Sequence, residues 1–225
     1  MTQNQQARID WTDDGVPIST RFNDPYFSRQ DGAAETRHVF LAGNDLPGRF
    51  RDGFRIAELG FGTGLNLLTT LAAWTESNIQ GTLHFTSFEA FPMTPADIVR
   101  ALDAFPGLAA FAAPMLDALS RGQTRFACGP ATARIVLGDA RVTLPAWTGR
   151  ADAWYLDGFA PAQNPELWQS DLLHHVAGHT ASGGTFATYT AAGHVRRTLA
   201  EAGFAVTRQP GFGRKRHMTT GRMGA

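Results

Sequence analysis

Short apolar runs alternate with segments of helical periodicity along most of the chain. FRIAELG, residues 54–60, is short, apolar and preceded by a turn, and it therefore predicts a buried strand. TLHFTSFEA, residues 82–90, alternates apolar and polar positions and is rich in residues that favour strands. The same criteria predict further strands at residues 133–140, 151–158 and 183–190.

Helical patterns fill the intervals between these strands. In residues 65–74, four apolar side chains recur at the spacing of one helical face. A second helix is predicted over residues 165–179, which begin with proline and have a glycine near their end. A third is predicted over residues 191–203, which end on glycine.

This alternation of strands and helices predicts an α/β fold with a doubly wound, mostly parallel sheet. Residues 204–211 and 215–223 could pair as a terminal antiparallel hairpin, so we expect about seven strands, the last antiparallel. Residues 92–127 are rich in alanine and interrupted by proline, which predicts a helical insertion in a core domain of residues 51–225. Residues 1–50 are expected to form an N-terminal extension packed on that core.

The turn after the first strand carries glycine at alternate positions. ELGFGTGLN, residues 58–66, places Gly60, Gly62 and Gly64 between a strand and a helix, where a positive φ or close approach to a ligand requires glycine. Leu65 stands where the dinucleotide fingerprint needs glycine, so NAD or FAD fits poorly. The pattern instead resembles the first motif of class I S-adenosylmethionine-dependent methyltransferases (Rossmann-like), which implies S-adenosylmethionine as cofactor. A glycine turn with only a structural role is the alternative.

Acidic residues mark the carboxyl ends of the next predicted strands. Glu89 ends the second strand about 25 residues beyond the glycine turn, close to the ~20-residue offset at which an acid binds ribose hydroxyls. Asp139, preceded by Gly138, ends the third strand, where a carboxylate suits an adenine amino group. Each acid alone also suits a helix cap. The cofactor-binding residues predicted in the turn itself are Glu58, Gly60, Phe61, Gly62, Gly64, Leu65 and Asn66.

The fourth predicted strand ends on a carboxylate. LDGFAP places Asp157 directly after a core strand and follows it with glycine, phenylalanine and proline. Class I methyltransferases that alkylate nitrogen often carry a polar–proline–aromatic motif there, and LDGFAP has the same ingredients in another order. We therefore expect Asp157 to be the catalytic residue, which either accepts the proton of an amine or orients the amine by a hydrogen bond. A solvated turn is the alternative.

Longer motifs resemble one bacterial family. FNDPYFS, ETRHVFLAGNDL, ELGFGTGLN, DAWYLDGFAPAQNPELW and GFGRKRHM are together similar to the tRNA 5-(aminomethyl)-2-thiouridine methyltransferases, over about residues 10–218. The resemblance implies methyl transfer from S-adenosylmethionine to the primary amine of a modified wobble uridine, with Phe159 stacked on the uracil. Many members are fused to a flavin-dependent oxidase. Too few residues follow Met218 to form one, so the oxidase is expected as a separate partner or in a longer form of the chain.

Basic residues are concentrated near the C-terminus. The net charge is zero, yet residues 151–190 contain four acidic residues and no Lys or Arg, whereas residues 191–225 contain seven basic residues and one acidic residue. This asymmetry suits a polyanion such as the tRNA anticodon arm, although charge alone is equally consistent with a solvated surface. The predicted substrate-binding residues are Phe159, Arg196, Arg197, Phe212, Arg214, Lys215 and Arg216.

Other features bear on location and metal chemistry. The N-terminus has no apolar secretory segment and no apolar run approaches the ~18 residues of a membrane span, so we expect a cytoplasmic protein without a membrane partner. The single Cys128 is expected to be buried filler. His175 and His179 are four residues apart but lack the glutamate of a zinc motif, so no metal is expected. Asp24 and Tyr26 are weaker candidates for a wall over the cofactor.

Three classes of function remain open from the sequence. A tRNA amine methyltransferase agrees best with the motifs. A methyltransferase of a small-molecule or protein amine would not need the basic C-terminal region. A non-catalytic RNA-binding module would not need Asp157.

Overall fold

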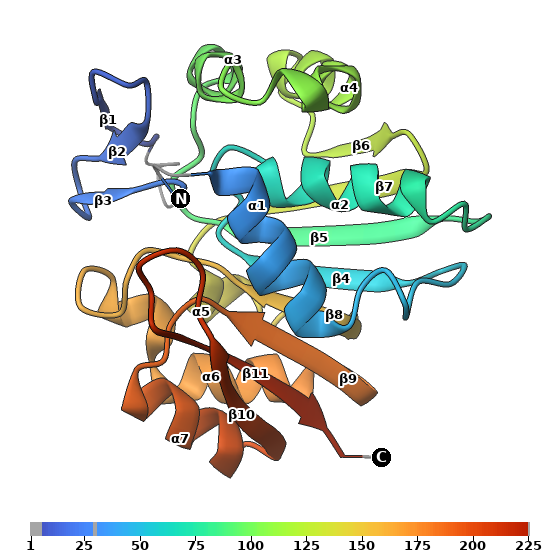
Figure 1. Ribbon diagram of the computed structural model, residues 1–225, viewed down its shortest axis with the longest axis vertical. Helices are drawn as coiled ribbons and strands as arrows, with labels where there is room; N and C mark the ends of the chain where they lie inside the picture. The colour runs from blue at the N-terminus through green and yellow to red at the C-terminus, as the bar shows by residue number, and fades with distance from the viewer. Residues whose placement is uncertain (1–5, 29–30, 225) are drawn as a thin grey trace.

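The computed structural model describes residues 6–28 and 31–224 and contains one large and one small sheet. The large sheet has eight strands in the order β10-β11-β9-β8-β4-β5-β7-β6 (Figure 1). Its strands are β4 (Arg55–Leu59), β5 (Leu83–Glu89), β6 (Arg125–Cys128), β7 (Ala131–Leu137), β8 (Ala151–Leu156), β9 (Thr180–Thr188), β10 (Phe204–Pro210) and β11 (His217–Met223).

The pairing confirms the predicted fold class. Strands β7, β5, β4, β8 and β9 run parallel, and β11 lies antiparallel between β9 and β10. The sheet has eight strands instead of about seven because β6 pairs antiparallel with β7 at the edge. The four residues of β6 are too short for a periodic signal, and the first three lie within residues 92–127, which were predicted as a helical insertion. The helices of this segment end at Ser120 instead.

Both faces of the parallel strands are buried. In β8, Tyr155 packs into one apolar cluster with α2 (Leu65–Glu76), whereas Trp154 and Leu156 pack into a second cluster with α6 (Ser170–Gly178) and α7 (Gly193–Glu201). Side chains of a strand point alternately to its two faces, so a strand covered on both faces is apolar throughout. The short helices α1 (Gly32–Thr36), η1 (Arg37–Leu41) and η2 (Ala42–Asn44) follow one another beside α2 (Figure 1).

The helix predicted over residues 165–179 is divided. A 3₁₀ turn, η4 (Pro165–Trp168), precedes α6, and Gln169 between them has an extended conformation (φ −65°, ψ 147°). The buried Trp168 donates its indole N–H to the carbonyl of Phe159 at 2.9 Å, which holds this turn against the loop after β8. A tertiary contact therefore interrupts a pattern that is helical by periodicity.

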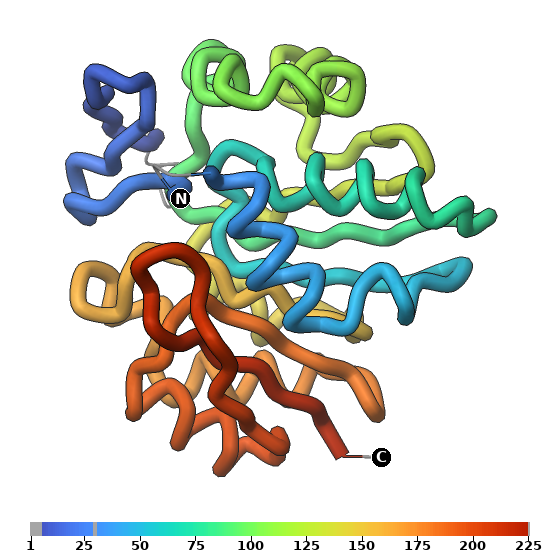
Figure 2. Tube along the Cα trace, viewed as in Figure 1, coloured from blue at the N-terminus to red at the C-terminus, as the bar shows by residue number. Residues whose placement is uncertain are grey.

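Two segments lie outside the alternating core. Helices α3 (Pro95–Leu102), η3 (Pro106–Leu108) and α4 (Ala109–Ser120) follow β5 and lie beyond α2 at the top of Figure 1. The N-terminal segment forms the small sheet β1-β2-β3, from β1 (Ile9–Trp11), β2 (Pro17–Ser19) and β3 (Asp24–Pro25). Residues 1–5 and 29–30 of the predicted extension lie outside the described residues. The loop between β10 and β11 lies beside α1 (Figure 2).

Within the described residues, no single helix is long and apolar enough to cross a membrane. Only the pair Pro95–Leu102 and Pro106–Ser120, which is bent by 119°, reaches the required length and composition together.

Asn44 fastens the N-terminal helices to the sheet. It is completely buried, and its side-chain N–H groups donate to the carbonyls of Phe40 (2.9 Å) and Trp154 (3.2 Å). Its side-chain oxygen accepts from the Thr185 hydroxyl at 2.6 Å. One amide therefore joins η1 to both β8 and β9.

We expect Asn44→Ala to lower the free energy of unfolding by about 2–4 kcal/mol, because several buried partners lose a hydrogen bond at once. Urea denaturation followed by circular dichroism measures this change. Gln80→Ala, at an exposed amide, is the control and should remain within about 0.5 kcal/mol of wild type. Equal stabilities of the two variants would contradict the role given to Asn44.

Candidate functional site

A cavity of about 750 Å³ opens at the carboxyl ends of the parallel strands. It is lined by the glycine turn after β4 and by the segments that follow β5, β7, β8 and β9. Residues of β3 and α1 complete the wall. Open α/β sheets bind ligands at this edge, and the volume lies within the roughly 300–1,000 Å³ of small-molecule sites.

The glycine turn permits a close approach between β4 and β8. Gly60 has φ +90°, and a Cβ atom at this position would lie 2.3 Å from the backbone oxygen of Asp157. Gly64 caps α2 with φ +78°, a conformation that glycine adopts without steric cost. Phe61 and Leu65 are buried in the apolar cluster on this face. Glycine at the first position is therefore required for the strand-end carboxylate to lie against the turn.

Three side chains from different elements form a hydrogen-bonded group beneath the turn. Asn66, in the first turn of α2, donates to Glu58 Oε1 at 2.8 Å and to Asp157 Oδ2 at 2.7 Å. Its own oxygen accepts from the Thr36 hydroxyl at 2.8 Å. Glu58 is completely buried, and its Oε2 has no hydrogen-bond partner within residues 6–28 and 31–224. Glu58 and Asn66, predicted as cofactor residues, therefore contact Asp157.

The environment of Asp157 favours its neutral form. Burial raises the pKa of this carboxyl to about 7, and the hydrogen bond from Asn66 opposes the rise. The negative charges of Glu35 and Asp24 raise this pKa further, whereas the ammonium of Lys215 lowers it. Burial also raises the pKa of Glu58 well above its ordinary value. Asp157 lines the cavity, and its carboxyl changes between the protonated and the ionised form near neutral pH.

Glu89 joins the end of β5 to the glycine turn. Its Oε2 accepts from the backbone N–H of Gly62 at 3.0 Å, and its Oε1 accepts from that of Phe91 at 2.7 Å. Burial raises the pKa of Glu89, and these backbone hydrogen bonds oppose the rise. A carboxylate oxygen accepts more than one hydrogen bond, so both oxygens keep the capacity to accept from a ligand hydroxyl.

Asp139 also lines the cavity but has a partner within the chain. It caps α5 (Ala140–Thr143) by accepting from the backbone N–H of Arg141 at 2.9 Å, and the Arg141 guanidinium contacts its Oδ2 at 2.6 Å. This guanidinium holds the pKa of Asp139 below its usual range. Gly138 donates its N–H to the carbonyl of Glu89 at 2.8 Å. An adenine contact of Asp139 stays a prediction, with Arg141 as an internal competitor.

Aromatic side chains surround the loop after β8. The ring of Phe159 stacks on that of Phe22 (centroids 4.7 Å apart) and meets the edge of Tyr26 at 5.1 Å. Asp24 accepts from the backbone N–H of Ala160 at 2.8 Å. The two weaker candidates, Asp24 and Tyr26, thus both line the cavity. Because Phe22 covers one face of the Phe159 ring, a uracil could stack only on the other face.

The structure separates the predicted substrate-binding residues. Lys215 alone of the C-terminal basic residues lines the cavity, where it donates to Glu35 at 2.8 Å and lies 4.1 Å from the centroid of the Tyr189 ring. Its side chain is exposed like those of Arg214 and Arg216 beside it. Of these three, only Lys215 is paired with a carboxylate of α1.

The remaining predicted contacts lie outside the cavity. Arg196 is half-buried, and its Nε has no hydrogen-bond partner among the described residues; Arg197 is exposed. Phe212 lies 5.9 Å from the ring of His38. Their contact with RNA stays a prediction.

Sequence reasoning missed several residues of the cavity. Tyr189 directly follows β9, so the strand-end rule that selected Asp157 applies to it as well. Phe22, Glu35 and Thr36 carry no local signal, because only the folding of the N-terminal segment over the sheet edge brings them there.

The histidine pair and the cysteine lie away from the cavity. His179 contacts the carbonyl of Gly149 through Nδ1 at 2.9 Å, and His175 is exposed. Cys128 is buried, with its Sγ 3.2 Å from the carbonyl of Phe111. Across residues 6–28 and 31–224, no three His, Cys, Asp or Glu side chains are grouped as they would be around a metal ion.

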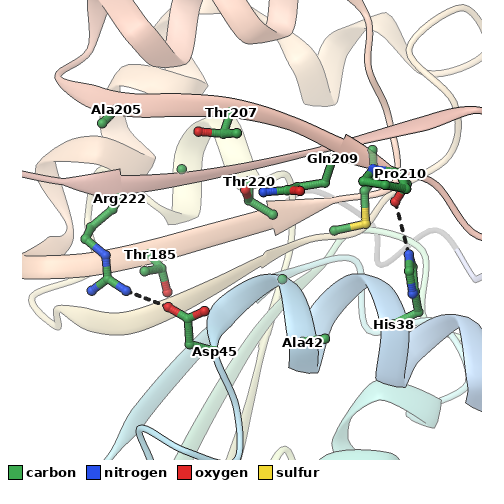
Figure 3. A pocket seen from close by; sticks show the side chains of 13 residues that line it. His38, Ala42, Asp45, Thr185, Ala205, Thr207, Gln209, Pro210, Thr220 and Arg222 are labelled. Carbon is green, nitrogen blue, oxygen red and sulfur yellow. Dashed lines mark hydrogen bonds and ion pairs between the residues drawn. The ribbon is translucent and has the colours of Figure 1, made fainter.

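A second, smaller cavity of about 330 Å³ lies between η1, η2 and the face of β10 and β11 (Figure 3). The ion pair of Arg222 with Asp45 (2.6 Å) and the contact of His38 with the Pro210 carbonyl (3.0 Å) bridge it. None of the predicted site residues lines this cavity.

The larger cavity fits an adenosyl cofactor with a cationic centre. Glu89 supplies hydrogen-bond acceptors that suit the hydroxyl groups of such a cofactor, and Asp157 supplies one that suits an amine beside it. Gly60 and Gly62 have positive φ and expose the backbone of the turn without side chains in the cavity. Phe22, Phe61 and Phe91 are among the aromatic residues of the apolar wall.

Comparisons with known proteins agree with this geometry. Residues 109–224 match a family described as S-adenosyl-L-methionine-dependent methyltransferases. The chain is 46% identical over 97% of its length to the tRNA 5-methylaminomethyl-2-thiouridine biosynthesis bifunctional protein MnmC of Marinobacter nauticus, and 48% identical over 96% to the protein of the same name from a Caulobacter strain. It spans only 37% and 38% of these curated relatives.

A solved structure shows the same similarity. The crystal structure of MNMC2 from Aquifex aeolicus superimposes with a TM-score of 0.77 and 26% identity, over 100% of this chain and 72% of that one. The fold and cofactor class expected from the sequence motifs agree with these similarities.

The pKa of Asp157 predicts how stability depends on pH. Since the folded state keeps this proton up to about pH 7, whereas an unfolded aspartate loses it near pH ~4, the free energy of unfolding falls as pH rises between these values. Asp157→Asn cannot ionise, so its stability relative to wild type should increase by roughly 2–4 kcal/mol from pH 4 to pH 8. Thermal unfolding at a series of pH values measures this difference. Gln80→Ala, at an exposed side chain that does not titrate, should give a difference that is independent of pH, and equal behaviour of both variants would contradict the buried state of Asp157.

Proposed function

Because the chain belongs to the family of S-adenosyl-L-methionine-dependent methyltransferases, we propose that it methylates the primary amine of 5-aminomethyl-(2-thio)uridine at the wobble position of tRNA. The product is 5-methylaminomethyl-(2-thio)uridine. The observation that carries this proposal is Asp157, a carboxylate at the end of β8 that faces the cavity and has one oxygen held by Asn66. The names of the relatives, which refer to biosynthesis of tRNA 5-methylaminomethyl-2-thiouridine, support the choice of substrate.

The cofactor contacts follow from the strand ends. When bound, S-adenosylmethionine supplies an electrophilic methyl group on a positively charged sulfur. Gly60 and Gly62 provide backbone against which the cofactor lies, and Glu89 accepts hydrogen bonds from the ribose hydroxyls. Asp139 and Gly138 contact the adenine edge. The carboxylates of the cavity, when ionised, also stabilise the positive charge of the cofactor sulfur.

Asp157 determines the state of the substrate amine. Only the neutral amine has the lone pair needed for attack, whereas an alkylamine in water has a pKa near ~10. Burial lowers the pKa of an amine and raises the pKa of a carboxyl. In the cavity the pKa of the substrate amine and the pKa of Asp157 are therefore closer than in water, which makes proton transfer from the amine to Asp157 less unfavourable. Oδ1 of Asp157 accepts a hydrogen bond from the amine, or its proton, while Asn66 holds Oδ2. With its N–H held by Asp157, the amine would keep its lone pair free to attack the methyl group that the bound cofactor supplies. Positioning of this kind supplies much of the acceleration.

Basic residues outside the cavity hold the RNA. The exposed side chains of Arg197, Arg214 and Arg216 contact phosphates. Lys215 instead donates to Glu35 and forms part of the cavity wall. Arg196 and Phe212 border the same C-terminal region. A flavin-dependent oxidase, separate or fused, acts beside this domain, in line with the word bifunctional in the names of the relatives.

The cofactor contact of Glu89 is tested by calorimetry with S-adenosylhomocysteine. We expect Glu89→Ala to weaken binding about 10–100-fold, because hydrogen bonds to a charged group contribute roughly 1.5–3 kcal/mol. Glu76→Ala, at the exposed end of α2, should bind as wild type does. Equal affinity of the Glu89 and Glu76 variants would remove Glu89 from the site.

The reaction itself is tested with labelled S-adenosylmethionine and tRNA from a strain that lacks this modification, followed by mass spectrometry of nucleosides. We expect label on the aminomethyl group of the wobble uridine, and a loss of at least about 100-fold in turnover for Asp157→Asn. Binding of S-adenosylhomocysteine should survive in this variant. Label on another nucleoside, or none with wild-type protein, would reject the proposed substrate.

A further inference from the structure

We propose that Asn66 is a positioning residue for Asp157, with Thr36 as the group that fixes the orientation of the Asn66 amide. This inference rests on the proposed function for its catalytic meaning, but its physical content concerns Asp157 alone. Asn66 lines the cavity, and its expected contact with the cofactor stays a prediction; its side chain also holds Asp157.

The contacts determine which way the amide faces. Its nitrogen lies 2.8 Å from Glu58 Oε1 and 2.7 Å from Asp157 Oδ2, so both N–H groups have a carboxyl oxygen as acceptor. Its oxygen lies 2.8 Å from the hydroxyl of Thr36, which donates to it. A flipped amide would place its oxygen against Oδ2 of Asp157, which repels it when Asp157 is ionised, and would leave the Thr36 hydroxyl without its acceptor. Asn66 is 7% exposed, so water cannot readily replace these partners.

This arrangement assigns different tasks to the two oxygens of Asp157. Oδ2 accepts from Asn66, which leaves Oδ1 to face the substrate. A carboxylate that rotates freely presents either oxygen, whereas one held at Oδ2 presents Oδ1 in a single direction. The geometry therefore orients the group that receives the amine N–H.

Asn66 also favours the ionised form of Asp157 against its surroundings. Glu35 of α1 and Asp24 of β3 face Asp157 with negative charge, and Lys215 of the β10–β11 loop faces it with positive charge. Glu58 of β4 shares the same amide. Tyr189, after β9, is kept neutral because burial and the charge of Asp157 raise its pKa. Within this set Asn66 is the neutral donor whose hydrogen bond lowers the pKa of Asp157.

Glu58 supports this assignment through its own protonation. Glu58 is completely buried, and burial raises its pKa well above its ordinary value, against the hydrogen bonds of Ser87 and Asn66. Burial disfavours the charged form of a carboxyl, so Glu58 is neutral. Asn66 therefore joins Glu58, which burial keeps neutral, to Asp157, which ionises near neutral pH.

The test is the titration of Asp157 by ¹³C NMR in protein labelled at the aspartate side-chain carboxyl carbon, with Asp157→Asn used to assign its signal. We expect Asn66→Leu to raise the midpoint by about one pH unit or more, because a hydrogen bond to the charged form is lost. Thr36→Val should raise it less and in the same direction, because the amide remains but loses its orienting partner. Should Asn66→Leu not fold, Thr36→Val alone decides the result.

Thr70→Val is the matched control. Its hydroxyl is also buried, and it donates to the backbone carbonyl of Asn66 at 2.7 Å instead of the side chain. This variant should lose stability without moving the midpoint. A midpoint that stays at the wild-type value in both Asn66→Leu and Thr36→Val, or that moves equally in Thr70→Val, would overturn the proposal.

The kinetic arm separates this inference from the proposed function. With tRNA as substrate, the acid limb of the pH profile of kcat should move upward in Thr36→Val together with the NMR midpoint. If tRNA is not methylated but the NMR midpoint moves as expected, the proposed function fails and the role of Asn66 stands. If tRNA is methylated and the midpoint does not move, the proposed function stands and the role of Asn66 fails.

Discussion

The close contact between the first glycine of the turn and the end of β8 is the constraint on which the site depends. Parallel pairing of β4 with β8 brings Leu59 beside Leu156, and the next residues of the two strands continue toward each other. Any side chain at Gly60 would strike the backbone oxygen of Asp157. Because this approach is possible, α2 can begin immediately above the strand ends and place Asn66 against both carboxyls. The position of Asp157 therefore depends on the packing of the main chain at Gly60 as well as on its side-chain contacts.

Burial of several acids at one sheet edge has an electrostatic cost that the surrounding structure offsets. Glu58 is completely buried and Asp157 and Glu89 line the same region. Two backbone N–H groups bond Glu89, and one amide bonds both Glu58 and Asp157. These donors are neutral, so they stabilise the carboxyls without cancelling their charge. Burial still keeps Glu58 neutral and raises the pKa of Asp157 to about 7. Once Asp157 is ionised, the cavity suits a ligand with positive charge, such as a sulfonium or an amine.

The N-terminal segment completes the site from outside the core. Asp24 holds the loop after β8 through the N–H of Ala160, and Glu35 holds the β10–β11 loop through Lys215. Phe22 stacks on Phe159. The segment that precedes the first core strand therefore forms one wall of the cavity, and its Glu35 contacts the β10–β11 loop there.

The sequence by itself determined the fold class, the glycine turn and the acids at the strand ends, because these depend on local periodicity and on short spacings. It also led to Asp157 and Glu89, since a carboxylate directly after an apolar strand lies at the binding edge of a parallel sheet wherever that strand is placed. Only the tertiary structure decided the partners: Asn66 contacts Asp157 across 91 residues, Asp24 contacts Ala160 across 136, and Glu35 contacts Lys215 across 180. It likewise interrupted the helix at Gln169, because Trp168 is held by the loop after β8. Such contacts join segments with no common local pattern, so their pairing follows from packing and could not be predicted from spacing along the chain.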